Sequence, residues 1–330
     1  MMTLLAGVDG GATKTVAVVG RPDGALLGSA RGPPSNYHNV GVKKAAKAIQ
    51  SSIALACQHG EVSTKNLGTV VMGLAGMDSP GNFRVGQRVA DLTRLAKRRV
   101  VKHDSVIALY AATLGRPGIV VNAGTGSFAA GLGRDGRAIR AGGWGRIIDD
   151  EGSAYHIGKL GIRAALRASD GVERKTQITN MLVRKLKLRT IEDIVHQVYE
   201  KPMTVEEISA ISKLVAQAAA KGDRVARDIF THEGEVLANL VSTIARHLGM
   251  TRSRPSVYLT GGVFKSGPVV LKPFRIELRK NVSRFTIRRP KFEPVIGAFI
   301  LALREQGVET RGRILTNLQA SYKRHLDSIR

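Results

Sequence analysis

Glycine-rich turns follow apolar segments at three places in this 330-residue chain. They read 9-DGGATKT-15, 124-GTGS-127 and 260-TGGVFKSG-267. Glycine in such a turn lets backbone N–H groups converge on an anion at a distance that a side chain would prevent. The three turns could therefore bind the phosphates of a nucleotide.

The first turn contains the residue types that phosphate and magnesium chemistry requires. Gly10 and Gly11 allow a close approach of the backbone, Thr13 offers a hydroxyl donor and Lys14 carries a positive charge. Asp9 ends an apolar strand, where its carboxylate could hold water on Mg²⁺. A plain hairpin, in which the Asp-Gly pair serves only the turn, accounts for the same residues.

The other two turns could complete a nucleotide site. Gly124–Ser127 is a glycine turn of the same kind as the first, so the two turns could hold a polyphosphate from both sides. The third turn joins a strand to a helix, and Gly261, Gly262 and the helix N-terminus could carry the ribose and α-phosphate. No GxxxxGK[ST] sequence occurs. The one GxGxxG, 131-GLGRDG-136, precedes a strand pattern and is interpreted as a hairpin turn.

A carboxylate follows another apolar run in the first half of the chain. The run 99-RVVKHD-104 delivers Asp104 to the start of a helical segment. The carboxyl edge of an α/β sheet is the usual place for a ligand. Asp104 could also cap this helix.

The elements that must position these residues form two similar series. The first has three strand patterns with tight turns, followed by alternating helices and strands. Its segments are 4–11, 15–20, 25–32, 42–59, 67–76, 82–96, 99–104 and 105–115. The order β-β-β-α-β-α-β-α is typical of an α/β layer with a mixed sheet.

The second series opens with three more strand patterns at 118–126, 127–133 and 136–143. Helical patterns dominate 152–248, and a strand, a helix, a strand and a helix follow at 256–262, 267–280, 284–288 and 294–306. The repetition predicts two domains, 1–114 and 115–330. Residues 311–329 form a basic amphipathic pattern, which we interpret as a terminal helix docked on the body of the protein.

The charge of the chain is strongly positive, because 51 Lys and Arg residues face 26 Asp and Glu, a balance of +25. Residues 252–291 hold eleven of the basic residues against Glu277 alone. Aromatic residues make up only 5%, however, and no stacking platform for bases is present. We therefore expect no specific nucleic-acid partner. No apolar run approaches the ~18 residues of a membrane span, so we expect no membrane segment.

A single cysteine, Cys57, restricts the chemistry further. It cannot form an internal disulfide or supply a zinc or iron–sulfur site alone, which fits a reducing compartment. We expect a cytoplasmic protein, and a homodimer is compatible with the sequence.

The motifs, in this order, resemble the phosphate-1, phosphate-2 and adenosine segments of the actin, Hsp70 and sugar-kinase (ASKHA) superfamily. Within it, the chain is most similar to the N-acetylglucosamine kinase family, grouped with BadF/BcrA-type ATPases. The matching stretches are 8-VDGGATKT, 35-SNYH, 73-GLAGMD, 103-HDS, 123-AGTGS, 142-GGWG, 150-DEGSAYHIG and 260-TGGVFKS. The most specific match is 142-GGWGRIIDDEGSAYHIG. The resemblance implies two ribonuclease-H-like domains with mixed five-stranded sheets flanked by helices, and a nucleotide cleft between them.

The resemblance also implies a role for individual residues. Asp104 would be the catalytic base that contacts the 6-hydroxyl of a sugar. The implied sugar contacts are Asn36, Asp104, Ser127, Gly143, Trp144, Gly145 and Asp150. The implied nucleotide contacts are Thr13, Thr125, Gly126, Ala219, Gly262 and Ser266, in addition to the turn residues named above. Trp144 could stack on the sugar or could be an anchor in the core, and both interpretations remain open.

These implications predict an ATP- and Mg²⁺-dependent kinase for the 6-hydroxyl of a hexosamine or hexose, with N-acetylglucosamine as the expected substrate. Phe128 and Asp149 depart from the family pattern beside the sugar residues, which leaves a broad-specificity kinase for glucose, mannose or glucosamine open. A BadF-type ATPase without sugar-kinase activity is the other alternative. An electron-activating ATPase would need two cysteines from each subunit, and a zinc-containing ROK kinase would need several, whereas this chain has only Cys57.

Overall fold

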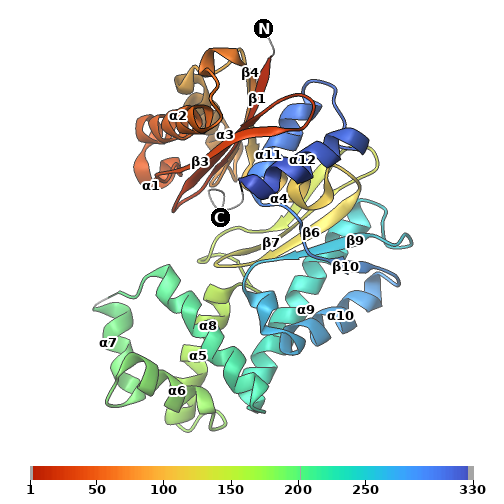
Figure 1. Ribbon diagram of the computed structural model, residues 1–330. Helices are drawn as coiled ribbons and strands as arrows, with labels where there is room; N and C mark the ends of the chain where they lie inside the picture. Colours follow the sequence, from red (N-terminus) through yellow and green to blue (C-terminus); the bar gives the residue numbers. More distant parts are fainter. Residues whose placement is uncertain (1–2, 201, 326–330) are drawn as a thin grey trace. The chain divides into compact units, whose positions relative to one another are not determined.

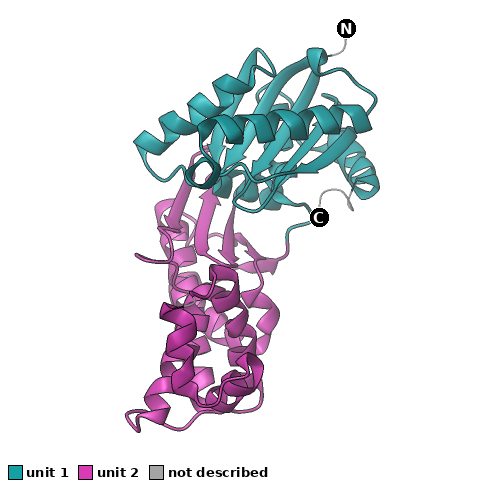
Figure 2. Cartoon of the chain, turned by 90° about the vertical axis from the view of Figure 1, so that its left-hand side faces the viewer, with its two compact units in different colours: residues 1–117, 290–330 teal, residues 118–289 magenta. Residues whose placement is uncertain are grey.

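The computed structural model describes residues 3–200 and 202–325 (Figure 1). The chain forms two compact units, Met1–Pro117 with Pro290–Arg330, and Gly118–Arg289 (Figure 2). The first crossing between the units lies after Pro117, three residues beyond the predicted division at 114/115. The prediction placed 290–330 in the second domain, and the structure corrects this, because these residues belong to the first unit.

The sheet of the first unit is mixed and five-stranded. Its order is β3 (Leu26–Gly32), β2 (Thr15–Gly20), β1 (Leu4–Gly10), β4 (Leu67–Leu74) and β5 (Arg98–His103). β1, β2 and β3 form antiparallel hairpins, whereas β4 pairs parallel to β1 and β5 pairs parallel to β4. Every residue of β2 and nearly every residue of β1 and β4 is buried, which explains why their sequences read as apolar runs rather than as alternations.

Helices cover this sheet. They are α1 (Tyr37–Val40), α2 (Val42–His59), α3 (Pro80–Thr93), α4 (Asp104–Thr113), α11 (Pro294–Arg304) and α12 (Gly312–Arg324), with the 3-10 turn η1 (Thr64–Asn66). α2 packs on β2, β3 and α3, whereas α11 packs on β1, β4 and α4. Nine consecutive residues of α11, Val295–Leu303, are buried. Its apolar surface is therefore satisfied by the first sheet, which is why the chain returns to the first unit.

The C-terminal helix α12 lies against β3. Leu318 and Tyr322 are buried, and the Ser321 hydroxyl accepts the Leu26 backbone N–H at 2.9 Å. The side chain of Asn317 donates to the Asp23 carbonyl at 2.9 Å. Positions 326–329 of the predicted helix 311–329 lie outside the described residues.

The sheet of the second unit repeats the first. Its order is β10 (Thr286–Arg288), β9 (Ser256–Thr260), β6 (Gly118–Ala123), β7 (Ser127–Leu132) and β8 (Ala138–Gly142). β6, β7 and β8 are antiparallel neighbours, and β9 and β10 are added in parallel. The two sheets share one strand order, which confirms the predicted repetition and the fold class of two mixed five-stranded sheets flanked by helices.

The predicted helical region 152–248 is a series of helices between β8 and β9. They are α5 (Ala154–Ser169), α6 (Gln177–Leu186), η2 (Ile191–Asp193), α7 (Ile194–Tyr199), α8 (Val205–Ala220) and α9 (Arg224–His247). η3 (Val263–Ser266) and α10 (Pro268–Asn281) follow β9. No helix in the described part of the chain is both long enough and apolar enough to cross a membrane.

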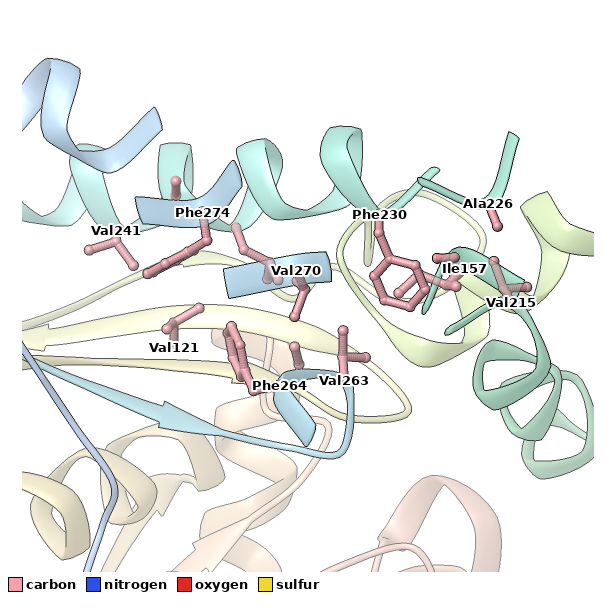
Figure 3. Close-up of a cluster of buried hydrophobic side chains, with 14 of the residues drawn as sticks. Val121, Ile157, Val215, Ala226, Phe230, Val241, Val263, Phe264, Val270 and Phe274 are labelled. Carbon is pink, nitrogen blue, oxygen red and sulfur yellow. The ribbon is translucent and has the colours of Figure 1, made fainter. Parts of the chain in front are cut away.

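A continuous hydrophobic core joins these helices to the second sheet (Figure 3). Phe230 of α9 and Phe274 of α10 are fully buried, and Phe274 meets Phe264 edge to face with ring centroids 5.8 Å apart. Val121 of β6 lies in the same cluster. Fully burying an aromatic or aliphatic side chain of this size contributes about 1.5–3 kcal/mol to stability. The core therefore holds β6 and η3 in place, and two of the glycine turns adjoin these elements.

Candidate active site

Three strand ends meet at one edge of the first sheet. The parallel register pairs Asp9 with Gly73 and Gly10 with Leu74, and it pairs Leu74 with His103. The carboxyl ends of β1, β4 and β5 therefore reach the same edge, as parallel pairing requires. The Ala75 backbone N–H donates to the Gly10 carbonyl at 3.2 Å, so the contact between the two chain segments continues just past the end of β4.

The first glycine turn is joined to the segment that carries Asn36. The Gly11 N–H donates to the Lys14 carbonyl at 3.0 Å, and the Gly11 carbonyl accepts the N–H groups of Ser35 and Asn36, both at 3.1 Å. The Asn36 side chain caps α1 by accepting the His38 N–H at 3.0 Å. Thr13 is exposed at the tip. The structure thus brings the predicted phosphate turn and the predicted sugar residue Asn36 together.

Asp9 lies in an unusual electrostatic setting. Burial raises its pKa, the carboxylates of Asp104 and Glu293 raise it further, and Lys14 opposes them, which leaves the pKa at about 7 instead of 3.8. A carboxylate whose charge is this poorly compensated favours a nearby cation. Asp104, the first residue after β5, is thus one of the charges that act on Asp9.

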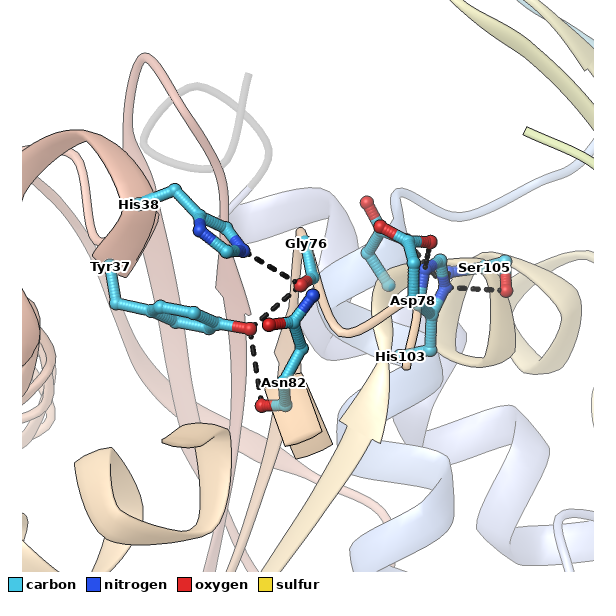
Figure 4. Close-up of polar contacts among 8 residues, drawn as sticks. Tyr37, His38, Gly76, Asp78, Asn82, His103 and Ser105 are labelled. Carbon is cyan, nitrogen blue, oxygen red and sulfur yellow. Dashed lines mark hydrogen bonds and ion pairs between the residues drawn. The ribbon is translucent and has the colours of Figure 1, made fainter. Parts of the chain in front are cut away.

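Asp104 is the first residue of α4 and is partly exposed. Its Oδ1 lies 2.8 Å from His103 Nδ1. His103 caps α4 by accepting the Ser105 N–H at 3.1 Å, and its Nε2 lies 3.0 Å from Asp78 Oδ1 (Figure 4). The sequence argument gave the cap to Asp104, and the structure corrects this, because the imidazole of the preceding residue is the cap.

The loop that carries Asp78 is held by a separate set of contacts (Figure 4). The Gly76 carbonyl accepts the Tyr37 hydroxyl at 2.7 Å and lies 3.0 Å from His38 Nε2. The Tyr37 hydroxyl also lies 3.2 Å from the Asn82 carbonyl. The segment after Asn36 therefore supports the loop between β4 and α3.

In the second unit, the second glycine turn is joined to the loop before α5. The Ala154 N–H donates to the Gly124 carbonyl at 2.7 Å, and the Ser127 hydroxyl donates to the Glu151 carbonyl at 2.6 Å. A Cβ added to Gly126 would lie 2.9 Å from Asp150 Oδ2. The structure therefore brings Thr125, Gly126, Ser127 and Asp150 together.

A buried glutamate fixes the loop that carries Asp150. Glu233 of α9 is fully buried, accepts the Gly152 N–H and lies 3.0 Å from His156 Nδ1. Asp150 itself has a left-handed φ of 62°, which is uncommon for a residue with a side chain. Strained backbone of this kind persists only where neighbours determine it, and Glu233 supplies that restraint.

The predicted wall of the sugar site follows β8. Gly143 packs beside the start of β7, where a Cβ would lie 3.0 Å from Phe128 Cβ. Trp144 is 57% exposed, and the Arg140 guanidinium lies 5.0 Å from its ring centroid. The core-anchor interpretation of Trp144 is therefore wrong, and its ring is available to a ligand. Gly145 faces open space.

The third glycine turn packs directly on the second. Gly261 has a φ of 92°, and a Cβ there would lie 2.2 Å from the Ala123 carbonyl oxygen. The Thr260 hydroxyl lies 3.1 Å from Asn122 Oδ1. Gly262 faces open space, and Ser266 ends η3. Two of the three predicted nucleotide turns thus form one surface within the second unit.

Ala219 is the predicted site residue that the structure does not support. Its side chain is fully buried in the core of the second unit, near the end of α8. A side chain without accessible surface cannot contact adenine, so the ordinary packing interpretation of an alanine in a helix is the correct one.

Sequence analysis missed three residues that organise this site, namely His103, Asp78 and Glu233. His103 and Asp78 lie inside quoted motifs, and an acceptor side chain directly before a helix is a recognisable N-cap signal. Glu233 gives no such signal, because its partner Gly152 lies 81 positions away in the sequence.

The donor set fits a loosely held magnesium ion. The edge offers the carboxylate oxygens of Asp9, which suit Mg²⁺. Among the described residues, no group of three or more His, Cys, Asp or Glu side chains could enclose a metal. Mg²⁺ usually keeps several waters and is shared with substrate phosphates, so the observed set is compatible with that mode and not with a closed protein cage.

Comparison with known proteins gives one family and several full-length relatives. The model of the BadF/BadG/BcrA/BcrD ATPase family matches residues 6–302. The N-acetylmuramic acid/N-acetylglucosamine kinase of Clostridium acetobutylicum is 30% identical over 304 residues, which cover 92% of this chain and 99% of that protein. The N-acetyl-D-glucosamine kinase of Dictyostelium discoideum is 29% identical over 90% of this chain and 97% of its own length.

Solved structures show the same fold. A structure described as a putative N-acetylglucosamine kinase from Chromobacterium violaceum superposes with a TM-score of 0.72 at 23% identity, over 92% of this chain and 99% of that one. A ROK family glucokinase from Streptomyces griseus gives 0.56 at 18% identity, over 91% and 99%. At these identities the likeness concerns the fold alone.

Proposed function

Because this chain belongs to the BadF/BadG/BcrA/BcrD ATPase family, we propose that it is an ATP-dependent sugar kinase that phosphorylates the 6-hydroxyl of N-acetylglucosamine. The family membership agrees with the sequence resemblance. Two relatives matched over nine-tenths of the chain are named as kinases of this sugar, which supports both the reaction and the substrate.

One observation carries the proposal, namely the position of Asp104. It opens α4 at the sheet edge where Asp9 and the first glycine turn also lie, close enough to Asp9 to raise the pKa of that residue. Phosphoryl transfer to an alcohol needs a base beside the acceptor hydroxyl and cationic or N–H groups beside the phosphates. This edge provides both.

In the proposed reaction, Asp104 accepts the proton of the sugar 6-hydroxyl as that oxygen attacks the γ-phosphorus. Thr13, Lys14 and the N–H groups of the first turn stabilise the charge on the transferring group. When bound, Mg²⁺ supplies further neutralisation of the phosphate oxygens, and Asp9 is the residue that would hold it through water.

The second unit supplies the remaining assignments. We assign the phosphates to Thr125 and Gly126 and the nucleoside to the turn at Gly261, Gly262 and Ser266. We assign sugar hydroxyls to Asp150, Ser127 and, from the first unit, Asn36. Carboxylate, hydroxyl and amide groups accept and donate the paired hydrogen bonds that a polyol requires. Trp144 offers an exposed aromatic face for the sugar ring.

The alternative of an electron-activating ATPase is disfavoured by Cys57. This residue is buried in α2, and burial raises the pKa of its thiol to about 11. A metal-cluster ligand must be a thiolate and must reach the surface at which subunits meet, whereas this thiol is neutral and enclosed.

The test is ADP release measured with ATP and Mg²⁺ across N-acetylglucosamine, N-acetylmuramic acid, glucosamine, glucose and mannose. We expect N-acetylglucosamine to stimulate release and to yield the 6-phosphate, identified by NMR. Asp104→Asn should lower kcat by about 10²–10⁴-fold, the contribution of a general base. Asp91→Asn, an exposed acid of the same unit, is the matched control and should retain wild-type kcat.

Three other outcomes of this experiment would change the proposed function or the assignment of the base. ADP release that no sugar stimulates would favour the general ATPase. Equal stimulation by glucose, mannose and N-acetylglucosamine would favour a broad-specificity kinase. Full sugar-dependent activity in Asp104→Asn would contradict the assignment of the base.

A further inference from the structure

His103 makes contacts that no single protonation state can satisfy. Its Nδ1 lies 2.8 Å from Asp104 Oδ1 and 3.1 Å from the Ser105 backbone nitrogen. The Ser105 N–H can only donate, so it requires a lone pair on Nδ1. An ionised Asp104 can only accept, so it requires a proton there. The Ser105 hydroxyl, at 2.8 Å, can adapt to either form.

The other imidazole nitrogen, Nε2, carries a proton in both forms. Nε2 lies 3.0 Å from Asp78 Oδ1, and a carboxylate at that distance requires a proton on Nε2. Neutral His103 therefore carries its proton on Nε2 and turns the Nδ1 lone pair toward Ser105 and Asp104. Charged His103 satisfies both carboxylates instead. The two forms differ by one proton at Nδ1, directly beside Asp104.

This arrangement matters when Asp104 receives a proton. A protonated Asp104 can donate its O–H to the Nδ1 lone pair, which is already 2.8 Å from the carboxylate. If the proton moves across to Nδ1, the imidazolium is stabilised by Asp78 on its far side. Hydrogen bonds that involve ionised groups are roughly twice as strong as neutral ones, so each position of the proton has a partner.

We propose that His103, supported by Asp78, is a positioning residue that shares the proton which Asp104 removes from the acceptor hydroxyl. This inference rests on the proposed function. In the step, the sugar O–H bond breaks, the bond from that oxygen to the γ-phosphorus forms, and the bond to the ADP leaving oxygen breaks. The proton passes to Asp104 and is shared with Nδ1 until it leaves to water after the transfer.

The contacts of the loop between β4 and α3 hold Asp78 in a fixed position beside His103. Asp78 lies on the segment anchored through the Gly76 carbonyl to Tyr37 and His38. Asp104 and Ser105 lie in the first turn of α4, whose N-terminus His103 caps. The two carboxylates thus come from separate elements, Asp78 at Nε2 of the ring and Asp104 at Nδ1. Asp9, Lys14 and Glu293 are the other charged groups whose fields meet at this edge, and the variants below leave them unchanged.

The sharpest variant is His103→Asn, because asparagine is also a good N-cap and can accept the Ser105 N–H. It keeps the cap and removes the group that can take a proton. We expect kcat to fall about 10–100-fold, while KM for sugar and for ATP stays within about twofold, because we assign no substrate contact to His103. Asp78→Asn should lower kcat in the same direction but less, since its amide oxygen still accepts from Nε2. Asp91→Asn, an exposed acid of the same unit, is the control and should retain kcat.

Two readouts separate proton sharing from a purely structural role. The acidic limb of the pH profile of kcat/KM should differ between His103→Asn and the wild type and should be unchanged in Asp91→Asn, because one proton-binding group has been removed beside the base. The solvent deuterium isotope effect on single-turnover transfer should show a curved proton inventory in the wild type and a linear one in His103→Asn.

A measurement without turnover completes the test. In protein with ¹⁵N-labelled histidines, the His103 signals are those absent from His103→Asn. At neutral pH they should show a proton on Nε2 and none on Nδ1, and the titration of this ring should change in Asp104→Asn. A proton on Nδ1 instead, or wild-type kcat and pH profile in His103→Asn, would overturn the inference. If Asp104→Asn is inactive while His103→Asn matches the wild type, only this inference fails. If Asp104→Asn is fully active, the proposed function fails first.

Discussion

The carboxylate of Glu233 accepts the backbone N–H of Gly152 inside the second unit, where the glutamate is fully buried. This contact and the adjacent pairing with His156 hold the loop that carries Asp150. Removing this buried acceptor would leave the Gly152 N–H without a partner and the His156 ring without this contact. Glu233 therefore contributes to stability and to the geometry of the sugar residues together.

Glu233→Ala should lower the free energy of unfolding by about 2–3 kcal/mol, the cost of leaving a buried hydrogen-bond donor unsatisfied, and should raise KM for the sugar more than KM for ATP. Glu233→Gln should lose less, since its amide oxygen can still accept the Gly152 N–H. Urea unfolding and steady-state kinetics measure the two effects. Asp228→Asn, an exposed acid on the same helix, is the control. Equal stability of Glu233→Ala and the wild type would contradict the role assigned to this contact.

Neighbouring glycines of the third turn allow folding and nucleotide binding to be separated. Gly261→Ala should destabilise the protein by about 2–3 kcal/mol, because it combines a left-handed φ with a Cβ 2.2 Å from the Ala123 carbonyl. Gly262→Ala should leave stability within about 0.5 kcal/mol, since a Cβ there meets nothing within 4 Å and its φ is −71°.

The same open position is where we assign the nucleoside. Gly262→Ala should therefore raise KM for ATP several-fold and leave KM for the sugar unchanged, as steady-state kinetics would show. An unchanged KM for ATP in a folded Gly262→Ala protein would place the nucleoside elsewhere.

The order of strands and helices could be predicted from the sequence because it depends on local patterns. Apolar runs such as 4-LLAGV and 69-TVVMGL, ended by glycine turns, are properties of consecutive residues. The pairing of α11 with the first sheet is not local. Its sequence shows a buried helix, but either sheet could have covered it, and the prediction assigned it to the second domain.

The site residues divide in the same way, into those that a local motif predicts and those that depend on distant contacts. Asp104, Asp150 and the glycine turns could be found because each stands in a short motif. The contacts that orient them join residues far apart in the sequence, such as His103 with Asp78, 25 positions away. One acidic residue on a 24-residue helix, Glu233, cannot be distinguished by sequence from its exposed neighbours. Burial and pairing, which decide its role, arise only from the packed fold.

Trp144 provides an intrinsic probe of sugar binding, because it is the only tryptophan in the chain. Its ring is 57% exposed and rests beside Arg140, so stacking of a sugar on it should change its fluorescence. Titration with N-acetylglucosamine in the absence of ATP should give a saturable change in emission. Trp144→Ala should leave stability within about 0.5 kcal/mol and raise KM for the sugar about tenfold, the value of one aromatic contact. Trp144→Phe should retain most of the affinity. Sugar-independent emission together with an unchanged KM would exclude the stacking role.

The raised pKa of Asp9 makes a prediction about stability and pH. In the unfolded chain this carboxyl ionises near pH 4, whereas in the folded protein it holds its proton up to a pKa of about 7. Between these values the folded state binds more protons than the unfolded state, so this group makes stability fall as pH rises from about 4 to 7. The loss is complete above pH 7 and is on the order of 4 kcal/mol at most, at about 1.4 kcal/mol per unit.

Asp9→Asn removes this titration. Measured by urea unfolding with a chelator present, the variant should gain stability relative to the wild type between pH 5 and pH 8, by about 2–4 kcal/mol. Adding Mg²⁺ at pH 8 should stabilise the wild type, because the ion favours the charged carboxylate, and should not stabilise Asp9→Asn. Asp91→Asn, which alters an exposed carboxylate, should follow the wild type under all of these conditions. A difference between Asp9→Asn and the wild type that stays constant from pH 5 to pH 8 would show that burial and the charges of Asp104 and Glu293 do not act on Asp9 as described.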